Sequence, residues 1–128
     1  MASFDVFNRV LDHCFEAVVS VDPDGRIVFF NSASERLFGY AAEEVLQRHL
    51  DVLMPEAMQG KHQALIDAFS AANVESQVMG RNGEIRARRK DGSEFAAEGT
   101  ISKVQLGNQM LFTAILRDVE ARREAERR

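Results

Sequence analysis

The chain has 128 residues, of which 45% are hydrophobic and 28% charged, and its formal net charge is −4. This length suits one globular domain with its own hydrophobic core, so no disulfide or structural metal is needed. The acidic balance argues against a nucleic-acid partner, and no apolar run reaches the ~20 residues of a membrane-spanning helix. The single cysteine, Cys14, cannot form an internal disulfide, which favours a reducing compartment. From the cysteine and the lack of a long apolar run together, we expect a cytoplasmic domain without direct membrane contact.

The first elements are predicted to be a helix followed by a β-hairpin. An amphipathic helix is expected over residues 3–14, because apolar residues recur there at helical spacing, at Phe4, Phe7, Leu11 and Phe15. Residues 17–21 and 26–30 are rich in β-formers, and residues 22–25 (Asp-Pro-Asp-Gly) separate them. Proline fixes φ and glycine accepts a positive φ, so this linker is predicted to be the turn of the hairpin.

A short helix is predicted over residues 34–38. Asn31 or Ser32 offers an N-cap, and Glu35 stands three residues after Ser32, as in a capping box. Gly39 follows at the position where a helix commonly ends in the left-handed conformation. The helix is therefore expected to have both its start and its end encoded locally.

The longest helix is predicted over residues 57–72, after a helical turn over residues 42–47 and a break at Pro55. One face of this helix carries Met58, His62, Leu65, Ile66 and Phe69. Because these residues recur at helical spacing, we expect them to face the rest of the domain.

The second half of the chain is predicted to be three strands, over residues 76–89, 94–106 and 109–116, joined by short turns. Short turns imply an antiparallel meander. The chain is thus assigned to the α+β class, with helices across one face of a five-stranded antiparallel sheet. Residues expected in the core are Leu37, Phe38, Leu65, Ile66, Phe69, Ile101, Phe112 and Ile115.

The order of these elements, together with particular residues, resembles the PAS domain family. The matching pieces are residues 21–31 (Val-Asp-Pro-Asp-Gly-Arg-Ile-Val-Phe-Phe-Asn), 33–40, 43–45, Met54-Pro55, His62, Gly80-Arg81, 88–95 and 115–119. The resemblance runs from about residue 5 to residue 122 and implies the PAS fold, whose helices and sheet enclose a ligand cavity. It divides the chain into a flanking helix (1–16), a PAS core (17–118) and the start of a helical linker (119–128).

The resemblance also implies a function as a signal-input and dimerisation module. Family members typically precede an output domain, such as a histidine kinase of a two-component system or a cyclic-di-GMP enzyme. We therefore expect a homodimer and a covalently linked output domain. No nucleophile, base and orienting group stand together in a known catalytic motif, and no Cys/His cluster has zinc-site spacing, so the domain itself is not expected to be an enzyme.

His62 is the sharpest candidate site residue. One interpretation is a partly buried histidine satisfied by a backbone carbonyl. The other is a haem axial ligand, since neutral imidazole binds iron well. Similarity to FixL-type oxygen-sensor PAS domains implies the second, because their proximal histidine occupies this helix. The other positions of that haem pocket match poorly: Gly83 stands in place of an oxygen-contacting arginine and Gly99 in place of a leucine, whereas Ile101 is kept.

A flavin cofactor is not expected. The photoreactive cysteine of LOV-type domains lies in an Asn-Cys-Arg-Phe-Leu-Gln motif, which is absent. Cys14 belongs to a different predicted helix and is interpreted as a small hydrophobic residue. The cofactor is therefore none, an unknown small molecule, or haem.

A ligand cavity is predicted where small residues alternate along one strand. Ala97 and Gly99 would lie on its inner face, and Arg81 would point inward from the preceding strand if no bulge intervenes. Small walls and one arginine suit an anionic organic ligand. The alternative is that bulky residues such as Phe69 and Met58 fill the space, which would leave a purely structural dimerisation module. The expected lining is His62, Ile66, Phe69, Arg81, Ala97, Gly99 and Ile101.

The last predicted features concern signal exit and dimerisation. Asp118 stands at the place of the aspartate in the Asp-Ile-Thr motif that ends many PAS domains. It is expected to cap the linker helix or to pair with Arg26 or Arg117. The N-terminal helix carries an apolar stripe that must be buried against its own sheet or a second copy, which predicts a parallel homodimer through Phe4, Phe7 and Leu11.

Overall fold

The computed structural model describes residues 16–79 and 84–119. The elements in chain order are β1 (Ala17–Val21), β2 (Ile27–Phe30), α2 (Ser32–Phe38), α3 (Ala42–Val45), the 3-10 turns η1 (Leu50–Leu53) and η2 (Glu56–Met58), α4 (His62–Ala71), β3 (Ser76–Val78), β4 (Glu84–Arg88), β5 (Glu94–Leu106) and β6 (Gln109–Asp118). The predicted helix over residues 3–14, with Phe4, Phe7 and Leu11, lies outside the described residues, as do residues 120–128 of the predicted linker.

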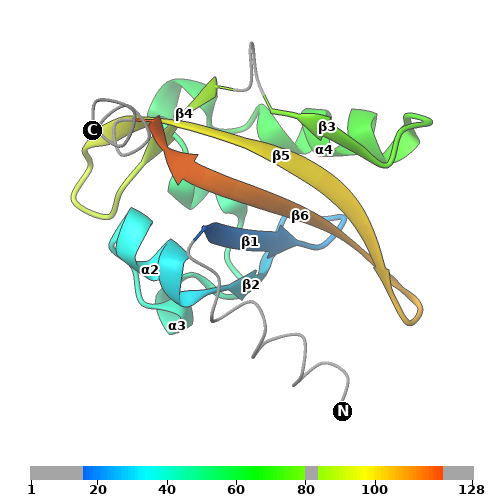
Figure 1. The fold of residues 1–128 in the computed structure, drawn as a ribbon, viewed down its shortest axis with the longest axis horizontal. Coiled ribbons are helices and arrows are strands. Elements are labelled where there is room, and N and C mark those ends of the chain that lie inside the picture. Colours follow the sequence, from blue (N-terminus) through cyan, green and yellow to red (C-terminus); the bar gives the residue numbers. More distant parts are fainter. Residues whose placement is uncertain (1–15, 80–83, 120–128) are drawn as a thin grey trace, which may run out of the picture.

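The strands form one antiparallel sheet in the order β2-β1-β6-β5, with β3 and β4 both pairing along the free edge of β5. The α+β class and the five-stranded antiparallel sheet are therefore confirmed, with the fifth place shared by two short strands. The β5–β6 hairpin is the longest pairing and runs across the molecule as a curved ribbon (Figure 1). The described helices lie between β2 and β3 in the chain, and their buried residues pack against one face of this sheet.

The single strand predicted over residues 76–89 is wrong, because the structure forms β3 and β4 instead. Val78 pairs with Thr100, whereas Glu84 pairs with Glu98. Between these two pairs the edge has four more residues than β5. Four is an even number, so side-chain alternation is kept across the insertion.

Helix α2 is determined by residues next to it. The side chain of Asn31 caps it by accepting a hydrogen bond from the backbone N–H of Ser34 at 3.0 Å. Glu35 does not complete a capping box with Ser32; its carboxylate instead accepts from the Ala42 N–H at 2.6 Å. Gly39 ends the helix at φ 81°, as predicted.

Helix α4 is shorter than predicted, because it begins at His62 rather than at residue 57. Residues 56–58 form a 3-10 turn instead, and Gly60 adopts φ 85°, which a continuous α-helix does not allow. The helix ends at Ala71, one residue before the predicted end.

The core lies between the helices and the sheet. Phe38 is fully buried and contacts the rings of Phe30 and Phe95, with centroids 5.9 and 5.6 Å away. Of the predicted core residues, Phe38, Ile66, Phe69 and Phe112 are buried, and Leu37 and Ile101 are partly buried against the core.

The core prediction is wrong for two residues. Leu65 is 56% exposed and Ile115 is 38% exposed. Ile115 stands between two residues that face the core side, Ala114 and Leu116, so strand alternation places it on the outer face. Leu65 borders a cavity, which leaves much of its side chain exposed.

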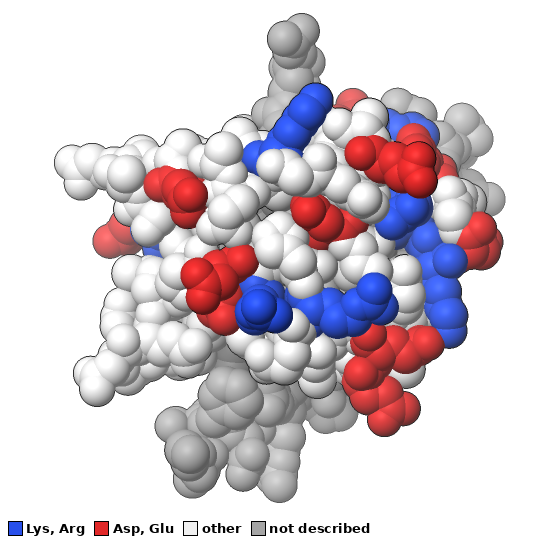
Figure 2. All heavy atoms as spheres, turned by 180° about the vertical axis from the view of Figure 1, so that it is seen from behind, with Lys and Arg blue, Asp and Glu red and all other residues white. Residues whose placement is uncertain are grey.

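The surface carries no large patch of one charge on the face opposite to that of Figure 1. Acidic and basic side chains are interspersed there, with uncharged residues between them (Figure 2). Within the described ranges, none of the helices has the length and apolarity required to cross a membrane.

Candidate functional site: a cavity beside α4

A cavity of about 700 Å³ lies between α4, the η1–η2 segment and the sheet. This volume falls within the ~300–1,000 Å³ typical of small-molecule sites. Its walls are mostly apolar, and they include both bulky residues that the filled-core alternative relies on, Phe69 and Met58. These two side chains border the space and do not fill it.

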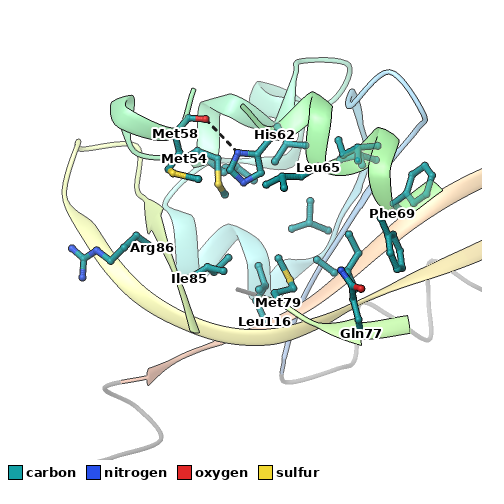
Figure 3. Close-up of a pocket in the computed structure, with 18 of the residues that line it drawn as sticks. Met54, Met58, His62, Leu65, Phe69, Gln77, Met79, Ile85, Arg86 and Leu116 are labelled. Carbon is teal, nitrogen blue, oxygen red and sulfur yellow. Dashed lines mark hydrogen bonds between the residues drawn. The ribbon is translucent and has the colours of Figure 1, made fainter. Parts of the chain in front are cut away.

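Two uncharged polar side chains, His62 and Gln77, line this cavity, and His62 is the one that was predicted. It is the first residue of α4, and its Nδ1 lies 3.5 Å from the carbonyl oxygen of Met58, at the long end of a hydrogen bond. Figure 3 shows the imidazole turned toward the cavity, near Met54 and Met58. If Nδ1 carries the proton donated to that carbonyl, Nε2 keeps its lone pair and can contact a ligand.

The predicted lining residues divide into three groups. The structure places His62, Ile66, Phe69 and Ile101 along the cavity. Arg81 lies outside the described residues. Ala97 and Gly99 do not line it, so the prediction is wrong for these two.

Ala97 and Gly99 miss the cavity for different reasons. Ala97 is fully buried in the hydrophobic core. Gly99 has no side chain to reach inward, and its main chain borders a shallow depression on the outer face, next to Thr100 and Ile115. A Cβ at Gly99 would lie 2.0 Å from the carbonyl oxygen of Ile115, so β6 approaches this residue too closely for any side chain.

Several lining residues were not predicted. Met79 and Ile85 follow the strand alternation that the sequence analysis used for Arg81, and the same alternation along the last strand selects Phe112, Ala114 and Leu116. Sequence periodicity gives no such indication for Leu50, Leu53 and Met54, since they belong to a 3-10 turn and the residue after it.

The charged residues at the cavity edge come from β4. Glu84 and Arg86 border it, but the guanidinium of Arg86 points away from the other labelled lining residues (Figure 3). Arg86 lies 3.5 Å from the carboxylate of Glu94, and both side chains are largely exposed. The guanidinium of Arg86 therefore does not place a positive charge inside the cavity.

Asp118 ends β6, and its carboxylate pairs with the guanidinium of Arg89 at 3.1 Å, an arginine that was not predicted. The other predicted role, a cap of the linker helix, involves residues outside the described ranges. Arg26 donates to the carbonyl of Gln47 at 3.2 Å. Arg117 pairs with Glu16 and Glu98 at 3.7 and 3.5 Å, on the outer face of the sheet.

Arg89 connects the end of β6 with two other parts of the chain. Its Nε donates to the carbonyl of Leu37 near the end of α2 at 3.2 Å, and its NH1 donates to the hydroxyl of Ser93 at 3.4 Å. The guanidinium also lies 4.2 Å from the ring centroid of Phe95. The planar fork of arginine allows this, because its several N–H groups point in different directions.

Comparison with known proteins agrees with this architecture. A family model described as PAS domain matches residues 16–121. The sensor protein FixL of Bradyrhizobium diazoefficiens is 27% identical over 113 residues, which is 88% of this chain and 22% of that protein. The oxygen sensor protein DosP of Escherichia coli is 28% identical over 117 residues, which is 91% of this chain and 14% of that protein.

Solved structures show the same fold. The crystal structure of the PAS domain of a protein from Colwellia psychrerythraea aligns with a TM-score of 0.73 and 25% identity, over 91% of this chain and 96% of that one. The chain spans less than a quarter of each of the two sensor proteins named above. Because the family model matches most of its length, the chain belongs to the PAS domain family.

Proposed function

We propose that this PAS domain is the sensory input module of a longer signalling protein and that it binds a small, largely apolar molecule in the cavity beside α4. The observation that carries the proposal is an apolar cavity of about 700 Å³ with one imidazole turned into it. Such a site suits a ligand that buries a hydrophobic body and is oriented by one polar contact. An anionic ligand gripped by Arg81 remains a variant of this proposal.

The whole protein is proposed to work in the cytoplasm as a homodimer, with a histidine kinase or cyclic-di-GMP output domain covalently linked to this one. The domain itself would perform no catalysis. The kinship with two sensor proteins of which it matches only a small part supports this arrangement. The N-terminal stripe of Phe4, Phe7 and Leu11 is the proposed dimer contact.

The signal is proposed to leave through β6. Phe112, Ala114 and Leu116 of this strand line the cavity, and the strand ends at Asp118. A ligand that shifts these side chains acts on the same rigid strand that carries Asp118 to its ion pair with Arg89. Asp118→Ala in the full-length protein should therefore change output activity while ligand affinity stays the same.

A second candidate is a haem-binding gas or redox sensor with His62 as the axial ligand. The residues fit an axial site, because metal-binding histidines commonly donate their other ring N–H to a backbone carbonyl, and Nδ1 of His62 faces the carbonyl of Met58. The apolar residues around it would hold the flat macrocycle. When bound, haem iron would supply a site for a diatomic gas or for a one-electron redox change.

The two candidates are separated by an absorption spectrum of the purified domain, alone and after addition of hemin. A Soret band that disappears in His62→Ala and returns when free imidazole is added to that variant would establish haem with His62 as its axial ligand. Absence of the band in the wild type would exclude the haem version and leave the apolar-ligand version.

The apolar-ligand version is tested by thermal-shift screening with small apolar molecules, including apolar carboxylates. A ligand at 100 times its dissociation constant stabilises the folded state by about 2.7 kcal/mol. The shift should shrink when Ile101→Trp fills the cavity from β5. If no compound of either class shifts the wild type, the ligand-binding proposal fails.

A further inference from the structure

The first turn of α4, which presents His62 to the cavity, has no local cap. The preceding residue, Lys61, makes no side-chain capping hydrogen bond, and the first turn contains no acidic residue. The N–H groups at a helix start are satisfied by side chains or by water. Besides the contact of His62 with the Met58 carbonyl, side chains from elsewhere in the chain hold this first turn.

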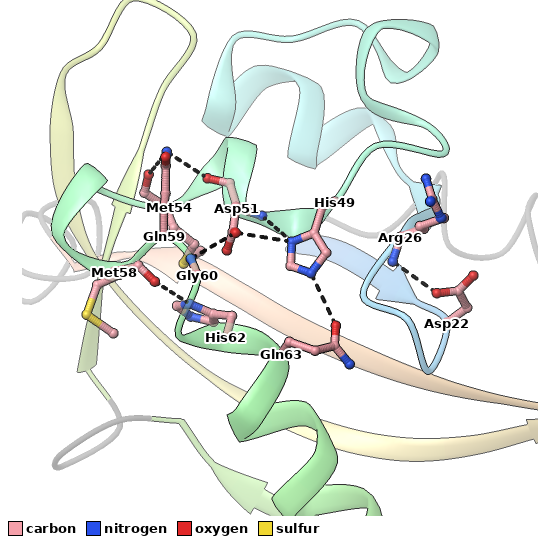
Figure 4. A network of polar contacts seen from close by, with 10 residues as sticks. All are labelled: Asp22, Arg26, His49, Asp51, Met54, Met58, Gln59, Gly60, His62 and Gln63. Carbon is pink, nitrogen blue, oxygen red and sulfur yellow. Dashed lines mark hydrogen bonds and ion pairs between the residues drawn. The ribbon is translucent and has the colours of Figure 1, made fainter.

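Gln63 supplies the first of these contacts. Its side-chain nitrogen donates to the carbonyl of Pro23 in the β1–β2 turn at 2.9 Å and to the carboxylate of Asp67 at 3.0 Å. Its side-chain oxygen lies 3.2 Å from Nε2 of His49 (Figure 4). One amide thus ties the start of α4 to two segments that precede it in the chain.

The hydrogen bonds of His49 assign its tautomer. Nδ1 lies 3.1 Å from the backbone N–H of Asp51, which it can accept only through a lone pair. The ring proton is therefore on Nε2, where it is donated to the oxygen of Gln63. Both ring nitrogens are used, and neither points into the cavity.

Asp51 holds the chain on the other side of His62. Its Oδ2 accepts from the backbone N–H of Gly60 at 3.0 Å (Figure 4). Asp51 therefore binds Gly60, two residues before His62, and His49 binds Gln63, the residue directly after it. The histidine that faces the cavity lies between these two attachments.

The β1–β2 turn leaves room for this arrangement at Gly25. A Cβ on Gly25 would lie 2.5 Å from Nε2 of His49 and 2.8 Å from Oε1 of Gln63. Gly25 also has φ 82°, a conformation that glycine adopts without strain. The contact between His49 and Gln63 therefore requires a residue without a side chain at position 25.

We infer that His49 is a positioning residue of the ligand site: through Gln63 and Asp51 it fixes the first turn of α4 and so the orientation of the His62 imidazole. The inference rests on the proposed function insofar as His62 contacts the ligand. His49 itself touches no ligand. Its substitution should alter the mobility of α4 and the affinity of the cavity together.

The test uses His49→Asn and Gln63→Leu. The asparagine oxygen can take the place of Nδ1 and keep the bond to Asp51, but the shorter side chain does not reach Gln63. Both variants should therefore loosen α4 while leaving η1 in place. His49→Asn removes one hydrogen bond of Gln63, so amide exchange at Ile66 and Asp67 should become about fivefold faster. Gln63→Leu also removes the bonds to Pro23 and Asp67 and should accelerate this exchange further.

The matched control compares two glycines. Gly25→Ala and Gly92→Ala carry similar backbone strain, at φ 82° and φ 90°, but no atom lies within 4 Å of a Cβ at Gly92. Only Gly25→Ala should accelerate exchange in α4 more than in α2. Global destabilisation would instead accelerate both helices equally in both variants.

The ligand readout is hemin affinity measured by titration, together with the NMR signals of the His62 ring without ligand. We expect about tenfold weaker hemin binding and shifted ring signals in His49→Asn and Gln63→Leu. Unchanged exchange at Ile66 and Asp67 with unmoved ring signals would overturn the inference. If the wild type binds no hemin, the haem candidate fails, whereas the exchange and ring signals still decide the role of His49.

Discussion

Two helices on the same face of the sheet, α2 and α4, are fixed by different means. Asn31 and Gly39, which flank α2, determine both of its ends, and its buried residues reach the centre of the core. Helix α4 has no side-chain cap at its start, and Leu65 in its middle is 56% exposed. Contacts from η1, the β1–β2 turn and β5 hold it instead.

The difference shows how one domain can combine a helix that is stable in position, α2, with a cavity-lining helix that can shift, α4. A locally capped helix whose inner residues are fully buried, such as Ser34 and Phe38 of α2, opens only when much of the domain unfolds. A helix held at its ends by a few polar contacts can shift at lower cost. Helix α4 contributes His62, Leu65, Ile66, Ala68 and Phe69 to the cavity lining, whereas α2 contributes Phe38, so a ligand would act mainly on α4.

The largest expected effect compares two phenylalanines. Phe38→Ala removes a fully buried ring between Phe30 and Phe95, and should lower the free energy of unfolding by about 4 kcal/mol. Phe69→Ala in α4 should cost less, about 3 kcal/mol, because Phe69 is slightly more exposed and packs against the ring of Phe112, 6.1 Å away between centroids, whereas Phe38 packs between two rings. Chemical denaturation of both variants measures the difference, and a larger loss for Phe69→Ala would contradict the comparison.

The cap of α2 should come next. The amide of Asn31, which is fully buried, accepts from the N–H groups of Val18 and Ser34 and donates to the carbonyl of Glu16. Asn31→Ala leaves these groups without that partner and should cost about 3 kcal/mol in urea denaturation. Asn73→Ala, at an exposed position, is the control and should change stability by less than about 0.5 kcal/mol. Equal effects would remove the distinction between the helices.

A smaller effect is expected at the end of α4. The ammonium of Lys103 on β5 donates to the carbonyl of Ala72 at 2.6 Å and lies 4.9 Å from the ring centroid of Phe69. Lys103→Met keeps the aliphatic stem but removes the charge from the helix C-terminus, and should cost about 0.5–1 kcal/mol at low salt. Lys61→Met, at the opposite end of the same helix, should not destabilise the domain. A loss that persists unchanged in high salt would contradict this electrostatic account.

The smallest effect concerns the contact between α3 and the β4–β5 turn. The hydrogen bond from Lys90 lowers the pKa of Glu44 below its ordinary value of 4.5, and the N–H of Ala41 adds to this. A lowered folded-state pKa contributes stability above the unfolded pKa, and this contribution disappears as the pH falls through the folded pKa. The stability difference between wild type and Glu44→Gln should therefore be present at pH 7 and vanish in acid. In a Lys90→Met background, which removes the main donor to this carboxylate, the acid-dependent difference should shrink.

The same contrast explains what the sequence could predict. The turn at residues 22–25, the end of α2 at Gly39 and the β5 strand are determined by residues in or beside them, and the predictions agree with the structure. The start of α4 was misplaced, because the helical pattern that includes Met58 runs on through a 3-10 turn and Gly60.

The candidate site was predictable only where periodicity applies. His62, Ile66, Phe69 and Ile101 follow from helix and strand periods. The partner of Asp118 could not be identified, since Arg89 is one of several arginines and only the fold brings it to the end of β6. The interaction of His49 with Gln63 depends on the same long-range arrangement.

Gly99 has a consequence for genetic studies of this domain. Any side chain there would collide with the main chain of β6, so every substitution should disturb the pairing of the two longest strands. In a screen scored by signalling output, such alleles would look like sensors that have lost their ligand. Measuring protein abundance alongside output would identify them as folding defects and keep them out of any map of the binding site.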